Sequence, residues 1–188
     1  MSDQVKPGFR ELFEAHYGYV RASLRRLGVH VRDLDDLTDD VFLRVHDRLH
    51  RHDPSTPVRP WLFAFAFRIA SDYRRLARHR LTFGVPEDQL ASDRPSPEDA
   101  MSKEEDVRLV HQALETMSLE TRGVFVMYEI DGHEMKEIAT ALGVPVNTAY
   151  SRLRLGRRAF AAKVRELRGI EADLGPDPDL EAEVEAGR

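Results

Sequence analysis

The chain has 188 residues, of which 41% are hydrophobic and 32% charged, with a formal net charge of -5 and no cysteine. This length suits one ordinary domain or two small ones, and the composition is globular rather than disordered. The lack of cysteine excludes disulfides, thiolate metal sites and a cysteine nucleophile. We find no apolar run near the roughly 20 residues of a membrane helix and no apolar core of a signal peptide. We therefore expect a soluble, cytoplasmic protein.

The first 28 residues predict one amphipathic helix. Apolar side chains recur at helical spacing from Phe9 to Leu27, and Gly28 is a helix stop. Gly18 lies inside this run, and a glycine there lowers helix stability, so the continuity of the helix is an open point.

The segment from Arg32 to His52 combines an apolar stripe with an acidic face. The stripe consists of Leu34, Leu37, Val41, Val45 and Leu49. Leu43 projects from the middle of the opposite face, among Asp36, Asp39, Asp40 and Asp47. A charged face is usually just solvated, and a single exposed leucine needs no explanation. The alternative is a docking site for a basic partner, in which the leucine supplies affinity and the carboxylates supply orientation.

The segment 59–80, RPWLFAFAFRIASDYRRLARHR, predicts a helix that begins near Trp61, after the Pro-containing loop Asp53–Arg59. Helical spacing places one set of side chains toward the core: Leu62, Phe65, Ile69, Tyr73 and Leu76. The other side is basic and carries Arg68, Ser71, Arg74, Arg75 and Arg78, with Phe63 and Phe67 at its edge. Arginines beside aromatic rings suit an unpaired nucleic-acid strand. A solvated basic face with two aromatics covered by another part of the protein is the simpler alternative.

Helical periodicity fades after residue 80, where a Pro-rich and acidic linker, residues 81–104, separates two predicted helical domains at residues 5–80 and 105–168. In the second domain, Ser118 or Thr121 can cap a helix, and Asp131-Gly132 predicts a turn. A short helix around Ile138, a break at Gly143 and a basic second helix fit a helix-turn-helix. The outward arc of that second helix holds Asn147, Thr148, Ser151, Arg154, Leu155 and Arg158, flanked by Arg152 and Arg157. Such residues contact base edges and phosphates in a major groove.

Motifs for bond chemistry are absent from the sequence. There is no P-loop and no Gly-rich dinucleotide turn, and His133-Glu134 is not followed by a second histidine at metal-binding spacing. We expect no catalytic residue, metal site or cofactor. The acidic segment 169–188 is predicted to be a solvating tail.

In order and spacing, these segments resemble the extracytoplasmic-function group of the bacterial sigma-70 family, from about Phe9 to Leu167. DLDDLTDDVFLRVHDRL is similar to the segment that docks on core RNA polymerase. RPWLFAFAFRIASDYRR is similar to the segment that opens and reads the minus-ten element. KEIATALGVPVNTAYSRLRLGRRAF is similar to the region-four helix-turn-helix that reads the minus-thirty-five element. The resemblance implies an all-α fold of two small domains, region 2 and region 4, joined by a flexible linker.

The resemblance also implies partners and site residues. The partners are core RNA polymerase, promoter DNA and an anti-sigma factor, with no membrane insertion. The implied polymerase-binding residues are Asp36, Asp39, Asp40, Leu43 and Asp47. The implied minus-ten residues are Arg59, Trp61, Phe63, Phe67, Arg68, Arg74, Arg75 and Arg78, with a flipped base held at the Asp53–Arg59 loop. The implied minus-thirty-five residues are Asn147, Thr148, Ser151, Arg152, Arg154, Arg157 and Arg158.

Four positions depart from the family pattern. Phe67-Arg68 stands where Arg-Asn is common, which predicts altered contacts to the melted strand. Tyr150 and Leu155 stand where basic residues are common, which predicts an unusual promoter sequence. The runner-up interpretation is a two-domain helix-turn-helix regulator that binds duplex DNA without polymerase and has no use for the acidic Leu43 face. A helical enzyme is a third interpretation, which predicts a pocket of clustered titratable groups.

Overall fold

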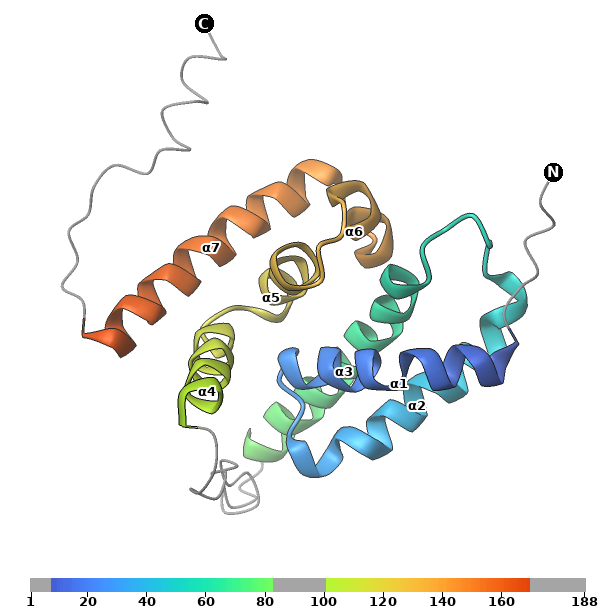
Figure 1. Cartoon of the computed structure of the whole chain (residues 1–188), viewed down its shortest axis with the longest axis horizontal. Helices are drawn as coiled ribbons and strands as arrows, with labels where there is room; N and C mark the ends of the chain where they lie inside the picture. Colours follow the sequence, from blue (N-terminus) through green and yellow to red (C-terminus); the bar gives the residue numbers. More distant parts are fainter. Residues whose placement is uncertain (1–7, 83–100, 170–188) are drawn as a thin grey trace, which may run out of the picture.

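A computed structural model describes residues 8–82 and 101–169, and these residues fold into seven α-helices (Figure 1). The helices are α1 (Phe9–Arg26), α2 (Leu34–Arg48), α3 (Val58–Thr82), α4 (Met101–Glu115), α5 (Leu119–Phe125), α6 (Met135–Leu142) and α7 (Val146–Arg168). Short helical turns occupy Val31–Asp33 and Leu49–Arg51, and a π-helical turn, Val126–Ile130, follows α5. The described residues contain no strand, so the predicted all-α fold is confirmed.

The first domain consists of α1, α2 and α3, and its first two helices form where the periodicity predicts them. Helix α1 is continuous through Gly18 and stops at Gly28, whose φ of 93° is a left-handed conformation that side chains disfavour. Helix α2 buries Leu34, Val41 and Val45. It also buries Phe42, outside the predicted stripe, because this ring packs edge-on against Phe13 at 4.8 Å between centroids and stacks on Tyr17.

Helix α3 is buried on more of its circumference than the sequence predicts. It begins at Val58, and Leu62, Phe65 and Ile69 are buried as expected. Two expectations are wrong: Leu76 is 57% exposed, and Phe63, predicted at the edge of the basic face, is fully buried. The reason is tertiary, because α1 and α2 cover one side of α3 while the second domain packs against the other (Figure 1).

The second domain consists of α4 to α7. Ser118 caps α5 by accepting a hydrogen bond from the Thr121 amide at 3.3 Å, so the first of the two predicted caps is the one used. Helices α6 and α7 form the predicted helix-turn-helix, and Gly143 ends α6 with a φ of 65°. Ala149 and Leu153 on α7 are buried against the rest of this domain.

Most of the predicted linker, residues 81–104, lies outside the described residues. Helix α3 extends to Thr82 and α4 begins at Met101, so both helices run into the predicted linker 81–104. Residues 83–100 and the tail from 170 onward lie outside the described residues. Within the described ranges, no helix combines the length and apolar character needed to cross a membrane.

Candidate nucleic-acid interface

The outward face of α7 is the first candidate surface. Asn147, Ser151, Arg154 and Arg158 are exposed together on it, while Thr148 and Arg152 are half-buried at its side. Arg157 lies apart from this group, because its Nε donates a hydrogen bond to Glu129 Oε1 at 2.7 Å and its guanidinium covers the Tyr128 ring. The face therefore offers two arginines, an amide and a hydroxyl, a set that can contact base edges and phosphates.

Two apolar side chains flank this polar face. Tyr150 is 54% exposed and Leu155 is 57% exposed. Sequence reasoning placed Leu155 on the arc and identified Tyr150 only as a departure from the family pattern. Apolar side chains on such a face contact thymine methyl groups in a major groove.

The predicted minus-ten residues do not all share one open surface. Arg59, Arg68 and Arg75 are exposed, whereas Trp61, Phe67 and Arg74 are half-buried. Phe63 is fully buried, so its ring cannot stack on a base in this conformation. The Arg78 side chain lies outside the described residues. The Arg59 guanidinium lies 5.2 Å from the centroid of the Tyr19 ring. The hydroxyl of the same tyrosine donates a hydrogen bond to Asp131 of the second domain.

The loop before α3 forms one wall of a cleft of about 530 Å³. The loop is held in shape by Asp53, whose carboxylate accepts a hydrogen bond from the Ser55 amide and whose carbonyl accepts one from the Thr56 hydroxyl. First-domain residues line one side of the cleft: Arg48, Arg51, Thr56, Pro57, Pro60, Trp61, Ala64, Phe65 and Arg68. The opposite side is lined by α6, through Lys136, Glu137, Thr140 and Ala141. A cleft thus lies beside this loop, and a helix of the second domain forms its opposite side.

Trp61 is positioned inside this cleft by its neighbours. The His52 ring stacks on it at 4.5 Å between centroids, and Phe65 packs edge-on against it at 5.0 Å. His52 is buried and held by the turn that ends η2, Leu49–Arg51. Arg48 and Arg68, which also line the cleft, place positive charge beside this aromatic group.

The acidic face of α2 forms as predicted. Leu43 is 66% exposed, and Asp36, Asp39, Asp40 and Asp47 are all exposed around it. This face lies on the opposite side of α2 from Val41 and Val45, which are buried in the first domain. An apolar knob ringed by carboxylates is suited to a partner with a basic rim.

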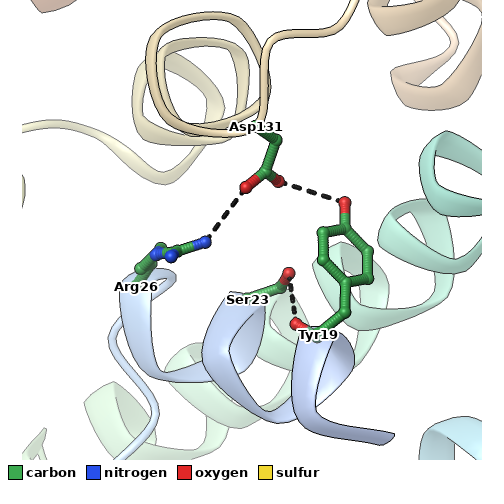
Figure 2. A network of polar contacts seen from close by, with 4 residues as sticks. All are labelled: Tyr19, Ser23, Arg26 and Asp131. Atoms are coloured by element: carbon green, nitrogen blue, oxygen red, sulfur yellow. Dashed lines mark hydrogen bonds and ion pairs between the residues drawn. The ribbon is translucent and has the colours of Figure 1, made fainter. Parts of the chain in front are cut away.

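Sequence reasoning missed a polar network between the domains. Asp131, interpreted only as a turn residue, has a side chain that is 5% exposed and accepts hydrogen bonds from Tyr19 and Arg26 of α1 (Figure 2). Burial raises the pKa of Asp131, an effect opposed by the Arg26 guanidinium. These partners lie more than a hundred residues away in sequence, so no local pattern identifies them.

Comparisons with known proteins identify both domains. The model of sigma-70 region 2 matches residues 12–80, and that of sigma-70 region 4 matches residues 108–160. The RNA polymerase sigma factor NccH of Alcaligenes xylosoxydans xylosoxydans is 30% identical over 159 residues, which cover 82% of this chain and 85% of NccH. The ECF RNA polymerase sigma factor SigL of Mycobacterium tuberculosis is 31% identical over 160 residues, covering 84% of this chain and 89% of SigL.

A solved structure shows the same fold. The sigma factor RpoE in complex with the anti-sigma factor NepR from Bartonella quintana matches with a TM-score of 0.66 and 18% identity, covering 87% of this chain and 98% of that one. Together with the two domain matches, these findings show that the chain belongs to the extracytoplasmic-function group of the sigma-70 family of RNA polymerase sigma factors. Sigma factors are DNA-binding factors of transcription initiation, so the helix-turn-helix regulator without polymerase is not the favoured interpretation.

Proposed function

We propose that this protein is an alternative sigma factor that binds core RNA polymerase, directs it to specific promoters and helps open the minus-ten element. In this scheme the acidic face of α2 around Leu43 docks on the polymerase and the outward face of α7 reads the minus-thirty-five element. The aromatic and basic side of α3 holds the unpaired strand. Bond chemistry stays with the core enzyme, and the site of action is the cytoplasm.

The exposed Leu43 among four exposed aspartates is the observation that carries this proposal. A regulator that binds duplex DNA alone has no use for such a face, whereas a polymerase-dependent factor needs a docking surface separate from its DNA surfaces. The helix-turn-helix supports both interpretations and therefore does not separate them.

We also propose that an anti-sigma protein controls the chain, since its relative RpoE has been solved with the anti-sigma factor NepR. A protein that covers α2 or α3 would prevent polymerase docking or strand binding.

Transcription from a library of promoter fragments, with purified core RNA polymerase and with or without this protein, tests the proposal. We expect defined start sites that require the protein. Sequence-specific duplex binding by the protein alone, without added transcription, would instead support the regulator.

A Leu43→Asp variant tests the docking surface in the same system. We expect it to bind core polymerase more weakly while remaining folded, because a carboxylate would replace the apolar centre of the face. Val107→Asp is the matched control, since Val107 is also an exposed apolar residue, at 56%, but lies on α4. Equal polymerase binding by both variants would remove the Leu43 face from the proposal.

A further inference from the structure

The cleft beside α3 is built from both domains and has the size of a small-molecule site. In the closed arrangement of the domains, which is the one in this structure, α6 packs next to α3 and forms the opposite side of the cleft. The volume of about 530 Å³ lies within the roughly 300–1,000 Å³ of ligand pockets. The proposed function assigns Trp61 and Arg68 of this cleft to the unpaired strand, but it gives no role to Arg48, Arg51 or Lys136.

The first-domain side of the cleft offers a flat aromatic surface. Trp61 is half-buried, and its orientation is fixed by the His52 ring, at 4.5 Å between centroids, and by Phe65, which packs edge-on at 5.0 Å. Ala64 and Pro60 line the same side with apolar side chains. Flat aromatic rings stack on such a surface, and every nucleobase has a π face that can do so. This side of the cleft therefore suits a nucleobase.

Positively charged side chains are in excess around the cleft. Four exposed cations line it from both domains: Arg48, Arg51 and Arg68 of the first domain and Lys136 of α6. The Arg48 guanidinium lies 5.9 Å from the centroid of the Phe65 ring, so positive charge is continuous with the aromatic surface. Guanidinium groups bind phosphate oxygens through paired hydrogen bonds, and an ammonium group binds them as a point charge. The cleft therefore suits an anionic ligand that also carries an aromatic ring.

The carboxylate that lines the cleft is engaged by its own helix. Glu137 Oε2 accepts a hydrogen bond from the Glu134 amide at 3.3 Å and lies 3.7 Å from Nδ1 of His133, both at the start of α6. It therefore offsets little of the charge of the four cations. One phosphate group carries at most about two negative charges. The excess of positive charge thus favours a ligand with two phosphates over one with a single phosphate.

We propose that this cleft binds a free nucleoside diphosphate, with its base stacked on Trp61 and its phosphates held by Arg48, Arg51 and Lys136. Because Arg51 and Lys136 belong to different domains, the bound ligand bridges the domains and stabilises the closed arrangement. Binding itself does not depend on the proposed function. One consequence rests on that function: a nucleotide on Trp61 occupies a residue assigned to the unpaired strand and competes with the strand for it.

Binding is measured on the full chain by quenching of tryptophan fluorescence, since Trp61 is the one tryptophan of the sequence. ADP is the probe, and adenosine and inorganic pyrophosphate represent the two parts of its chemistry. Free N-acetyltryptophanamide corrects for light that ADP absorbs, and titration calorimetry gives an affinity that does not depend on fluorescence. We expect ADP to quench saturably and to bind at least about ten-fold more tightly than either part, because only ADP makes both sets of contacts.

Two variants test whether both domains hold the ligand. Arg51→Ala and Lys136→Ala each remove one exposed cation, and each should weaken ADP binding about five-fold or more, as expected for the loss of a charge-assisted hydrogen bond. Lys163→Ala is the matched control, because Lys163 pairs with Glu166 on α7 and does not line the cleft. The affinity of this control for ADP should equal that of the parent chain.

Each element of the site has its own contrary result. Absence of both saturable quenching and heat of binding at millimolar ADP would overturn the site. Adenosine binding as tightly as ADP would overturn the role of the cations, and pyrophosphate binding as tightly would overturn stacking on Trp61. Unchanged affinity in Lys136→Ala would overturn bridging, and an equal loss in Lys163→Ala would reduce the effect to unspecific charge attraction. Failure of the parent chain to direct transcription would instead remove the proposed function and leave ADP binding unaffected.

Discussion

Replacing Gly123 by alanine adds one methyl group at the contact between α5 and α3. Its Cβ atom would lie 2.7 Å from Cε2 and 2.9 Å from Cδ2 of Phe67. Carbon atoms in contact prefer separations of about 3.5–4.0 Å, so either the ring or the helix must move. The added Cβ would also lie 3.7 Å from a methyl carbon of Leu142, which is an ordinary contact. The substitution thus pushes specifically on the interface between the domains.

Two effects of opposite sign determine the outcome. Overpacking a well-filled contact costs about 1–3 kcal/mol, and only the closed arrangement bears this cost. Alanine also stabilises a helix by about 0.5–1 kcal/mol relative to glycine. That gain is the same in the open and closed arrangements, because α5 belongs to the second domain in both. We therefore expect a shift of about 5–150-fold toward the open form, together with a more stable second domain.

Interdomain distances from spin labels at Glu14→Cys and Glu166→Cys measure the shift, and urea unfolding measures domain stability. The decisive comparison places Gly123→Ala in a Phe67→Ala background, where the methyl group no longer meets a ring. In the Phe67→Ala background, adding Gly123→Ala should not increase the interdomain distances further. An equal shift in both backgrounds, or unchanged distances in the single variant, would refute the steric argument.

Three further predictions concern the interface and α7. Burial and the charges of Arg25, Arg26 and Arg122 lower the pKa of His111 to about 4. The folded state therefore favours the neutral ring. The contribution of His111 to the free energy of unfolding is intact above about pH 6.5 and is lost as the pH falls toward 4. His111→Gln should therefore lose less stability than the parent across that window in urea titrations at stepped pH, and parallel curves would contradict this. Gly28→Ala should lower the free energy of unfolding by at least about 1 kcal/mol, because φ is 93° and the new Cβ would clash with Arg122. Gly132→Ala is the control, since its φ is 72° but its surroundings are open. An equal loss of stability in both variants would contradict the predicted clash with Arg122. If Arg154 contacts a base edge, Arg154→Ala should weaken promoter binding by about 1–3 kcal/mol. Arg165→Ala, near the end of α7, should not weaken it. Equal losses of affinity in a footprinting titration would argue against a contact between Arg154 and a base.

Local sequence signals predicted the helices well, because each signal acts within a few residues. Gly28 and Gly143 stop α1 and α6 in left-handed conformations, and the Ser118 side chain caps α5. The helix-turn-helix follows from the same kind of signal. The exposed Leu43 was also predictable, since a leucine that falls on the charged side of a helix has no apolar face to join.

The candidate site was predicted less completely. The exposed arc of α7 agrees with the helical spacing, but Arg157 is taken up by Glu129, 28 residues away. The loop at Asp53 does border a pocket, yet the pocket's other wall comes from α6. Both differences involve contacts between separate helices, which spacing within one helix does not encode.

By itself, the sequence determined which segments form helices, where glycines end α1 and α6, and which helix faces are polar, because backbone hydrogen bonds, glycine conformations and the 3.6-residue period are local properties. Only the tertiary structure decided which apolar faces are covered. Phe63 is buried and Leu76 exposed although both lie on one helix, and Asp131 meets Tyr19 and Arg26 across the domains. The physical reason is that burial and pairing depend on which distant surface packs on a helix, and a single carboxylate that reaches across such an interface leaves no periodic pattern along the chain.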